Sequence, residues 1–136
     1  MRYLAIDLGD KRTGIAVGVR ELCIAHPVCV LDIPIGEPLI KAIVSTVKRE
    51  DADELVIGLP INMDGSLGQR AELTKAFAQK IAEHTALNIH FQDERLTSSA
   101  AEEKLAKSGK THKQKKKIRD ALAAAEILQD FLHSLH

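Results

Sequence analysis

The sequence has little cysteine, few aromatic residues, no tryptophan and no long apolar run. Its two cysteines, Cys23 and Cys29, fall six residues apart in one expected strand. A strand advances about 3.3 Å per residue, so their Cα atoms would lie about 20 Å apart, whereas a disulfide needs less than about 7 Å. We therefore expect reduced thiols, with neither a disulfide nor a zinc site.

Aromatic residues make up 3% of the chain and apolar residues 45%, so the core must be aliphatic. The length of 136 residues fits a single domain, residues 1–136. No apolar run approaches the roughly 18 residues of a membrane span. The N-terminus runs straight into a strand-like pattern and resembles no cleaved leader. These features predict a cytoplasmic protein with no membrane partner.

The net charge is zero, but the charges are unevenly distributed. The segment 104–119 holds eight Lys and Arg residues and no Asp or Glu, which leaves eleven basic and nineteen acidic residues elsewhere. A basic segment of this kind attracts phosphates through counterion release. It is equally typical of a solvated loop and helix face, so charge alone leaves nucleic-acid binding open.

The pattern of apolar residues and turns predicts an α/β fold. A β-meander is expected first, with strands at 2–8, 13–19 and 23–32, and Pro27 indicates an edge or a bulge in the third. Helical and strand-like segments then alternate. We expect a helix at 37–50, a strand at 55–59, a loop at 60–68, and a helix at 69–84 with Leu73, Phe77 and Ile81 on one face. A strand at 87–91, a helix capped by Ser99, a loop at 107–111 and a last helix to about 132 follow. A meander followed by crossover strands predicts a mixed five-stranded sheet flanked by helices.

Asp7 lies inside the most apolar strand, where aspartate is rare. An ionised carboxylate buried without a partner is strongly unfavourable, so something must neutralise it. The structural alternative is a strand end hydrogen-bonded to the turn at Gly9. The functional interpretation is a metal or phosphate site at the carboxyl end of the strand, where α/β sheets open their ligand crevice.

Asp93 and Glu94 follow the strand at 87–91 and also lie at a carboxyl end. Adjacent like charges repel, and a cation would relieve that repulsion. The structural alternative is a polar loop with a local salt bridge to Arg95.

Asp120 heads an otherwise apolar stripe of the last helix, formed with Ala124, Ile127 and Phe131. The structural alternative is a favourable acid near a helix N-terminus. That alternative holds if the helix begins near residue 118 and weakens if it begins at 112.

Together these inward carboxylates describe a cage of oxygen ligands suited to Mg²⁺ or Mn²⁺. Two such ions about 4 Å apart can activate water and stabilise the leaving oxygen in phosphodiester hydrolysis. No histidine or cysteine constellation, Walker loop or nucleophilic serine competes with this interpretation.

Four segments resemble the motifs of the YqgF family, also called RuvX. They are residues 7–16 (DLGDKRTGIA), 56–60 (VIGLP) with 62–66 (NMDGS), 93–97 (DERLT), and 120–128 (DALAAAEIL). The resemblance covers nearly the whole chain and keeps the order of the motifs. It departs at Asp10, where the family more often has a small or hydroxyl residue, and this adds a negative charge near the expected site.

The resemblance implies a ribonuclease H-like fold with Asp7, Glu94 and Asp120 as a catalytic, metal-binding acidic triad. It implies a bacterial protein linked to maturation of the 5′ end of 16S ribosomal RNA, with ribosomal subunit precursors as partners. Resolution of Holliday junctions, a branched DNA, is the alternative for the same family. Junction resolution needs two coordinated cuts and hence a homodimer, whereas processing one RNA end needs only a monomer.

We assign the remaining polar residues as hypotheses. Lys11, Arg12 and Arg95 would face the scissile phosphate or its neighbours, and Asn62 would position the substrate. A basic cluster at the head of the last helix would follow the nucleic-acid backbone, and it comprises Lys113, Lys115, Lys116 and Lys117.

Two other classes of protein compete with a nuclease. A phosphotransferase of the actin and sugar-kinase type also has an Asp-x-Gly turn after its first strand, but it binds nucleotide between two large lobes. A non-catalytic RNA-binding assembly factor would account for the basic segment but leaves the triad unexplained. Replacement of Asp7 distinguishes an assembly factor from a nuclease, because an assembly factor would keep its cellular function without this carboxylate.

Overall fold

The computed structural model describes residues 1–62, 64–94 and 112–136, except for the side chains of 112–117. The described elements follow the order predicted for them. They are β1 (Arg2–Leu8), β2 (Thr13–Val19), β3 (Ile24–Leu31), α1 (Glu37–Glu50), β4 (Glu54–Leu59), α2 (Gln69–Thr85), β5 (Ile89–Asp93) and α4 (His112–Ser134). The helix expected at Ser99 and the loop at 107–111 lie outside the described residues.

The five strands form one mixed sheet in the order β3-β2-β1-β4-β5. The β1–β2 and β2–β3 pairs are antiparallel, while β4 lies parallel to both β1 and β5. The register of β2 against β3 shifts opposite Pro27, and β3 is an edge strand, as the proline indicated. The predicted mixed sheet is therefore confirmed.

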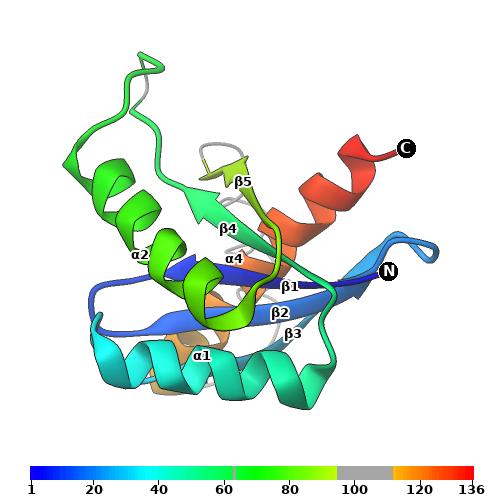
Figure 1. Cartoon of the computed structure of the whole chain (residues 1–136), viewed down its shortest axis with the longest axis horizontal. Helices are drawn as coiled ribbons and strands as arrows, with labels where there is room; N and C mark the ends of the chain where they lie inside the picture. Colours follow the sequence, from blue (N-terminus) through cyan, green and yellow to red (C-terminus); the bar gives the residue numbers. More distant parts are fainter. Residues whose placement is uncertain (63, 95–111) are drawn as a thin grey trace.

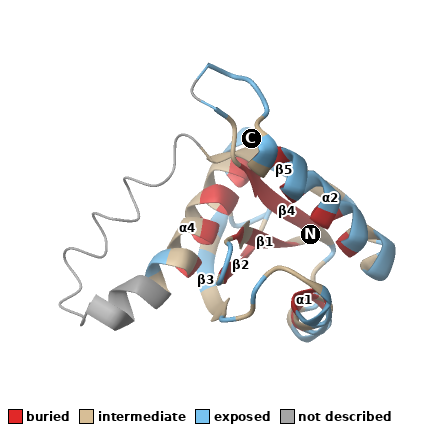
Figure 2. Ribbon diagram, turned by 90° about the vertical axis from the view of Figure 1, so that its left-hand side faces the viewer, coloured by how far each residue is buried: buried red, intermediate tan, exposed pale blue. Residues whose placement is uncertain are grey.

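Helices cover both faces of this sheet, as Figures 1 and 2 show. One face packs against α1 and α2 through alternate strand residues such as Leu4, Ile6 and Ile57. The other face packs against α4 through Tyr3, Ala5, Ala16 and Val56. The period-two alternation of strands thus assigns every second residue of β1, β2 and β4 to the α4 face.

The sequence placed two features of the second half incorrectly. The last strand is Ile89–Asp93 rather than 87–91, because α2 extends to Thr85 and Ala86 then caps it in a left-handed conformation with φ of 59°. Leu73 is 43% exposed, since the face of α2 toward the sheet contains other residues, namely Ala71, Thr74, Phe77, Ala78 and Ile81.

Helix α4 begins at His112, so Asp120 lies two turns inside it. The favourable field of a helix N-terminus fades within the first turn, so it does not explain this aspartate. The apolar stripe below it is buried as predicted, with Ala124, Ile127 and Phe131 at most 7% exposed. None of the described helices is long and apolar enough to cross a membrane.

Candidate functional site

Three carboxylates lie where the carboxyl ends of β1 and β5 meet α4. Asp7 occupies the α4 face of β1, since Ala5 before it packs in the α4 core. Glu94 directly follows β5 and is half-buried. Asp120 projects from α4, whose buried side faces the same surface of the sheet (Figure 2). The fold thus brings together elements separated by more than eighty residues.

Two glycines leave the space that the backbone of α4 and the side chain of Glu94 occupy. Gly14 pairs with Asp7 across β1 and β2, and a Cβ on Gly14 would lie 1.9 Å from the backbone oxygen of Asp120. Gly58 follows Ile57, the β4 partner of Ile6, so it lies beside Asp7. A Cβ on Gly58 would lie 2.5 Å from Oε1 of Glu94. Any side chain at these positions would displace α4 or Glu94.

Asp7 and Glu94 interact directly. Burial, a hydrogen bond with Asp7 and the negative charge of Asp7, in decreasing order of effect, together raise the pKa of Glu94 from 4.5 to about 9. Near neutral pH, Glu94 therefore holds a proton, and its hydroxyl donates to the Asp7 carboxylate. Two carboxylates share one proton where a cation would otherwise be needed.

Asp120 is held by Arg12 from the β1–β2 turn. The Nε of Arg12 lies 3.1 Å from Oδ2 of Asp120. This oxygen is shut off from water and has no hydrogen-bond partner among the described residues, so the contact is an ion pair without hydrogen-bond alignment. Burial raises the pKa of Asp120, Arg12 opposes that shift, and the charge of Asp7 reinforces it. Asp7 is therefore electrostatically coupled to both other carboxylates.

The donor chemistry of this site suits a hard divalent cation. All three side chains offer carboxylate oxygens, and the buried Oδ2 of Asp120 accepts no hydrogen bond from the described residues and is paired only with the Arg12 cation, whose place a metal ion could take. Within the described ranges, however, no three His, Cys, Asp or Glu side chains are already close enough to hold an ion. The reason is visible in the contacts, because Glu94 turns to Asp7 while Asp120 turns to Arg12.

The structure places only some of the other residues that were predicted to contact substrate. Lys11 and Arg12 line a hollow of about 280 Å³ together with Asp120, which places both cations at the candidate site. Asn62 follows β4, but its side chain donates to Ser66 Oγ at 3.1 Å and so organises its own loop. Arg95 and the side chains of Lys113, Lys115, Lys116 and Lys117 lie outside what the structure describes.

Arg70, near the start of α2, is a site residue that the sequence interpretation missed. Its Nη2 donates to the carbonyl oxygen of Leu8 at 2.8 Å, and its Nη1 donates to Asp10. Its charge also lowers the pKa of Glu94, opposing the burial. No motif singles out this arginine, and only the packing of α2 beside β1 brings it to the acids.

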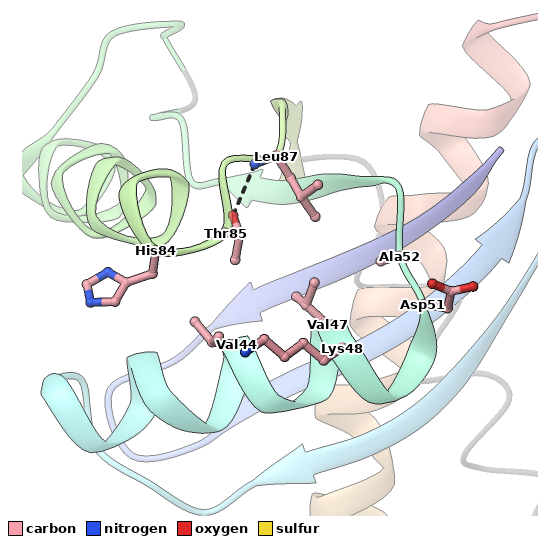
Figure 3. Close-up of a pocket in the computed structure, with 8 residues that line it drawn as sticks. All are labelled: Val44, Val47, Lys48, Asp51, Ala52, His84, Thr85 and Leu87. Atoms are coloured by element: carbon pink, nitrogen blue, oxygen red, sulfur yellow. Dashed lines mark hydrogen bonds between the residues drawn. The ribbon is translucent and has the colours of Figure 1, made fainter.

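Another hollow lies on the opposite side of the sheet. It has a volume of about 230 Å³ and lies between the C-terminal ends of α1 and α2 (Figure 3). Lys48, Asp51 and His84 line it beside aliphatic side chains, and the sole carboxylate in its lining is that of Asp51. This hollow lacks the grouped oxygen donors found at the candidate site.

Replacing Glu94 with glutamine should stabilise the metal-free protein, and the gain should increase with pH. Because folding raises the pKa of Glu94, the stability associated with its protonated form is fully present below about pH 4.5 and is lost as the pH rises through about 9. Glutamine keeps the hydrogen bond and cannot ionise. We expect a gain of about 1–3 kcal/mol at pH 8 and little change at pH 4.5.

Urea unfolding in chelator across this pH range measures the effect. The matched control is Glu83→Gln, which makes the same change at an exposed position of α2. Equal pH dependence of the two variants would contradict the assignment of a buried, protonated Glu94.

Comparison with known proteins gives a consistent family and fold. The family model described as "RuvX: Holliday junction resolvase" matches residues 1–134. A protein of Dechloromonas aromatica is 38% identical over 98% of this chain and 91% of its own length. One of Anaeromyxobacter sp. is 38% identical over 100% of this chain and 99% of its own length. Both relatives are named, provisionally, as pre-16S rRNA nucleases.

Solved structures with the same fold include two resolvases. T. thermophilus RuvC in complex with a Holliday junction substrate has a TM-score of 0.63 at 15% identity, covering 99% of this chain and 95% of its own. The fowlpox virus resolvase with junction DNA has a TM-score of 0.64 at 10% identity, covering 99% of both chains. At these identities the likeness shows the ribonuclease H-like fold alone.

Proposed function

The chain belongs to the RuvX family and is a nuclease, and from that premise we propose that it is a metal-dependent enzyme that processes the 5′ end of precursor 16S ribosomal RNA. Residues 1–136 would form one nuclease domain. The observation that carries the proposal is the grouping of Asp7, Glu94 and Asp120 on one face of the sheet, with Gly58 leaving room beside them.

Asp7, Glu94 and Asp120 would hold the metal, and Mg²⁺ or Mn²⁺ fits their oxygen donors. When bound, such an ion supplies an activated water and neutralises charge on the leaving oxygen. The chain itself must release the proton of Glu94, which a nearby cation favours. Arg12 and Lys11, which line the hollow beside Asp120, would attract and orient the phosphate.

Ribosomal RNA is favoured over junction DNA as substrate because relatives near 38% identity, matched along their length, carry the RNA-processing name. The resolvases share only the fold, at 10–15% identity. The family description nevertheless keeps junction cleavage as the second candidate. A monomer suffices for the first function, whereas the second needs a symmetric dimer.

The test compares a labelled single-stranded RNA spanning a ribosomal 5′ leader with a four-way DNA junction, each in Mg²⁺, Mn²⁺ or chelator. We expect metal-dependent cutting of the RNA and no paired nicks in the junction. Paired, symmetric nicks would instead assign the chain as a resolvase. Binding of RNA without cutting in either metal would leave an assembly factor as the better interpretation.

A further inference from the structure

Arg70 connects helix α2 to the turn between β1 and β2. One edge of its guanidinium donates to the carbonyl oxygen of Leu8 at 2.8 Å, and Nη1 pairs with Oδ1 of Asp10. The Arg70 side chain is 34% exposed, whereas that of Asp10 is 83% exposed. The cation is thus positioned by the protein backbone, while its counter-ion stands in water.

This arginine belongs to the same charged region as the triad. Asp10 and its neighbours Lys11 and Arg12 line the hollow that also contacts Asp120. The charge of Arg70 is felt at Glu94, so the guanidinium lies within electrostatic range of the acids. Lys11 and Arg12 therefore line the hollow itself, and Arg70 adjoins it through its contact with Asp10.

Stability does not explain the pair between Arg70 and Asp10. An ion pair with one partner in water contributes little to folding. The Leu8 carbonyl already fixes the guanidinium, so Asp10 is not needed to position it. Asp10 does occupy Nη1 of Arg70, a donor that could otherwise bind a phosphate. A guanidinium recognises that anion with strong, charge-assisted hydrogen bonds.

We propose that Arg70 is a phosphate-binding residue of the nucleic-acid site and that Asp10 is the carboxylate that a backbone phosphate of RNA displaces from it. This inference rests on the proposed function. It adds a contact between Arg70 and an RNA phosphate, for which Asp10 competes. Asp10 then tunes affinity downward, so that its loss strengthens binding of the substrate.

The test measures binding of a fluorescent single-stranded RNA by anisotropy, in chelator so that no cutting occurs. Asp10→Asn should tighten binding by about three- to tenfold, because the RNA phosphate no longer has to displace the Asp10 carboxylate from Arg70. Arg70→Gln should weaken binding by a similar factor. Arg70→Lys, which keeps the charge but loses the fork of donors, should fall between wild type and Arg70→Gln.

Salt dependence separates a phosphate contact from a change of fold. Each phosphate neutralised on a single strand adds about 0.7 to the slope of log affinity against log salt. Arg70→Gln should therefore flatten this slope, whereas Asp10→Asn, which binds the same phosphate as the wild type, should leave it nearly unchanged. Circular dichroism on both variants checks that the fold is retained.

Two controls separate the proposal from a general change in charge. Asp51→Asn removes one negative charge at the C-cap of α1, where φ is 54° and asparagine is well tolerated, and it lies at the hollow of Figure 3 on the opposite side of the sheet. It should leave affinity unchanged. The double variant Asp10→Asn/Arg70→Gln should bind no more tightly than Arg70→Gln alone.

The proposal would be overturned if Asp10→Asn raised RNA affinity equally in the presence and absence of Arg70. Repulsion between the Asp10 carboxylate and the RNA phosphates would then explain the gain. A loss or no change of affinity in Asp10→Asn would also overturn it and would leave the pair as a structural tether. In either case, cutting of RNA by the wild type keeps the proposed function intact. If the wild type binds no RNA at low salt, both fail together.

Discussion

Replacement of Asp7 by asparagine should abolish metal-dependent cleavage while leaving the chain folded. Asparagine has nearly the same shape, so the α4 face of β1 remains packed. It removes the carboxylate that is coupled to both Glu94 and Asp120. Because a metal ion supplies several kcal/mol of transition-state stabilisation, we expect the rate to fall by about three orders of magnitude or more.

Single-turnover cleavage of the RNA leader at saturating enzyme measures this effect, with urea unfolding as a check on the fold. The Asp51→Asn variant, which makes the same chemical change on the other side of the sheet, should cut at the wild-type rate. An Asp7→Asn protein that retained more than about a tenth of the wild-type rate would contradict a metal-binding role, since a loss below tenfold corresponds to less than about 1.4 kcal/mol.

Replacement of Gly14 by alanine should have the largest effect on stability. The new Cβ would lie 1.9 Å from the Asp120 oxygen, 2.3 Å from its carbonyl carbon and 2.9 Å from the Ala121 nitrogen. All three atoms are backbone, so no side-chain rotation relieves the overlap and α4 must move away from β2. We expect a loss of about 3 kcal/mol or more in the free energy of unfolding.

The same displacement should carry Asp120 away from Asp7 and reduce cleavage in whatever fraction remains folded. Gly68→Ala is the matched control, because its Cβ would meet the side chain of Asn62 at 3.2 Å rather than backbone. Its φ of −91° is also accessible to alanine. If the two variants unfolded at the same urea concentration, the close approach of α4 to Gly14 could not be what determines the position of Asp120.

Much of the fold was accessible from the sequence because strands and helices have different periods. The apolar run of β1 and the helical spacing of α1 each suit only one element, and the crossover order then defines a mixed sheet. The end of α2 was not accessible. Its left-handed cap at Ala86 carries no glycine or asparagine signal, so β5 was placed two residues early. The grouping of Leu73 with Phe77 and Ile81 was wrong for a related reason. The sequence of α2 allows more than one apolar face, and only the structure shows which of them packs on the sheet.

The sequence predicted those site residues whose charge is unusual for an apolar segment. Asp7 in a buried strand and Asp120 in an apolar stripe are both such residues, and the family resemblance chose Glu94 over Asp93. Arg70 is not unusual in this way, because an arginine early in a helix is ordinary until packing brings it against Leu8 and Asp10. The part played by Gly14 and Gly58 likewise depends on how closely α4 and Glu94 approach the sheet.

The most direct test of the central claim, that Asp7, Glu94 and Asp120 hold the catalytic metal, is anomalous diffraction from crystals of the protein soaked in Mn²⁺. We predict a peak within about 2.0–2.4 Å of carboxylate oxygens from all three residues, with Glu94 turned from Asp7 toward the ion. The same soak of Asp7→Asn crystals should show no peak there. A wild-type peak elsewhere, or none in a protein that cuts RNA with Mn²⁺, would contradict the account.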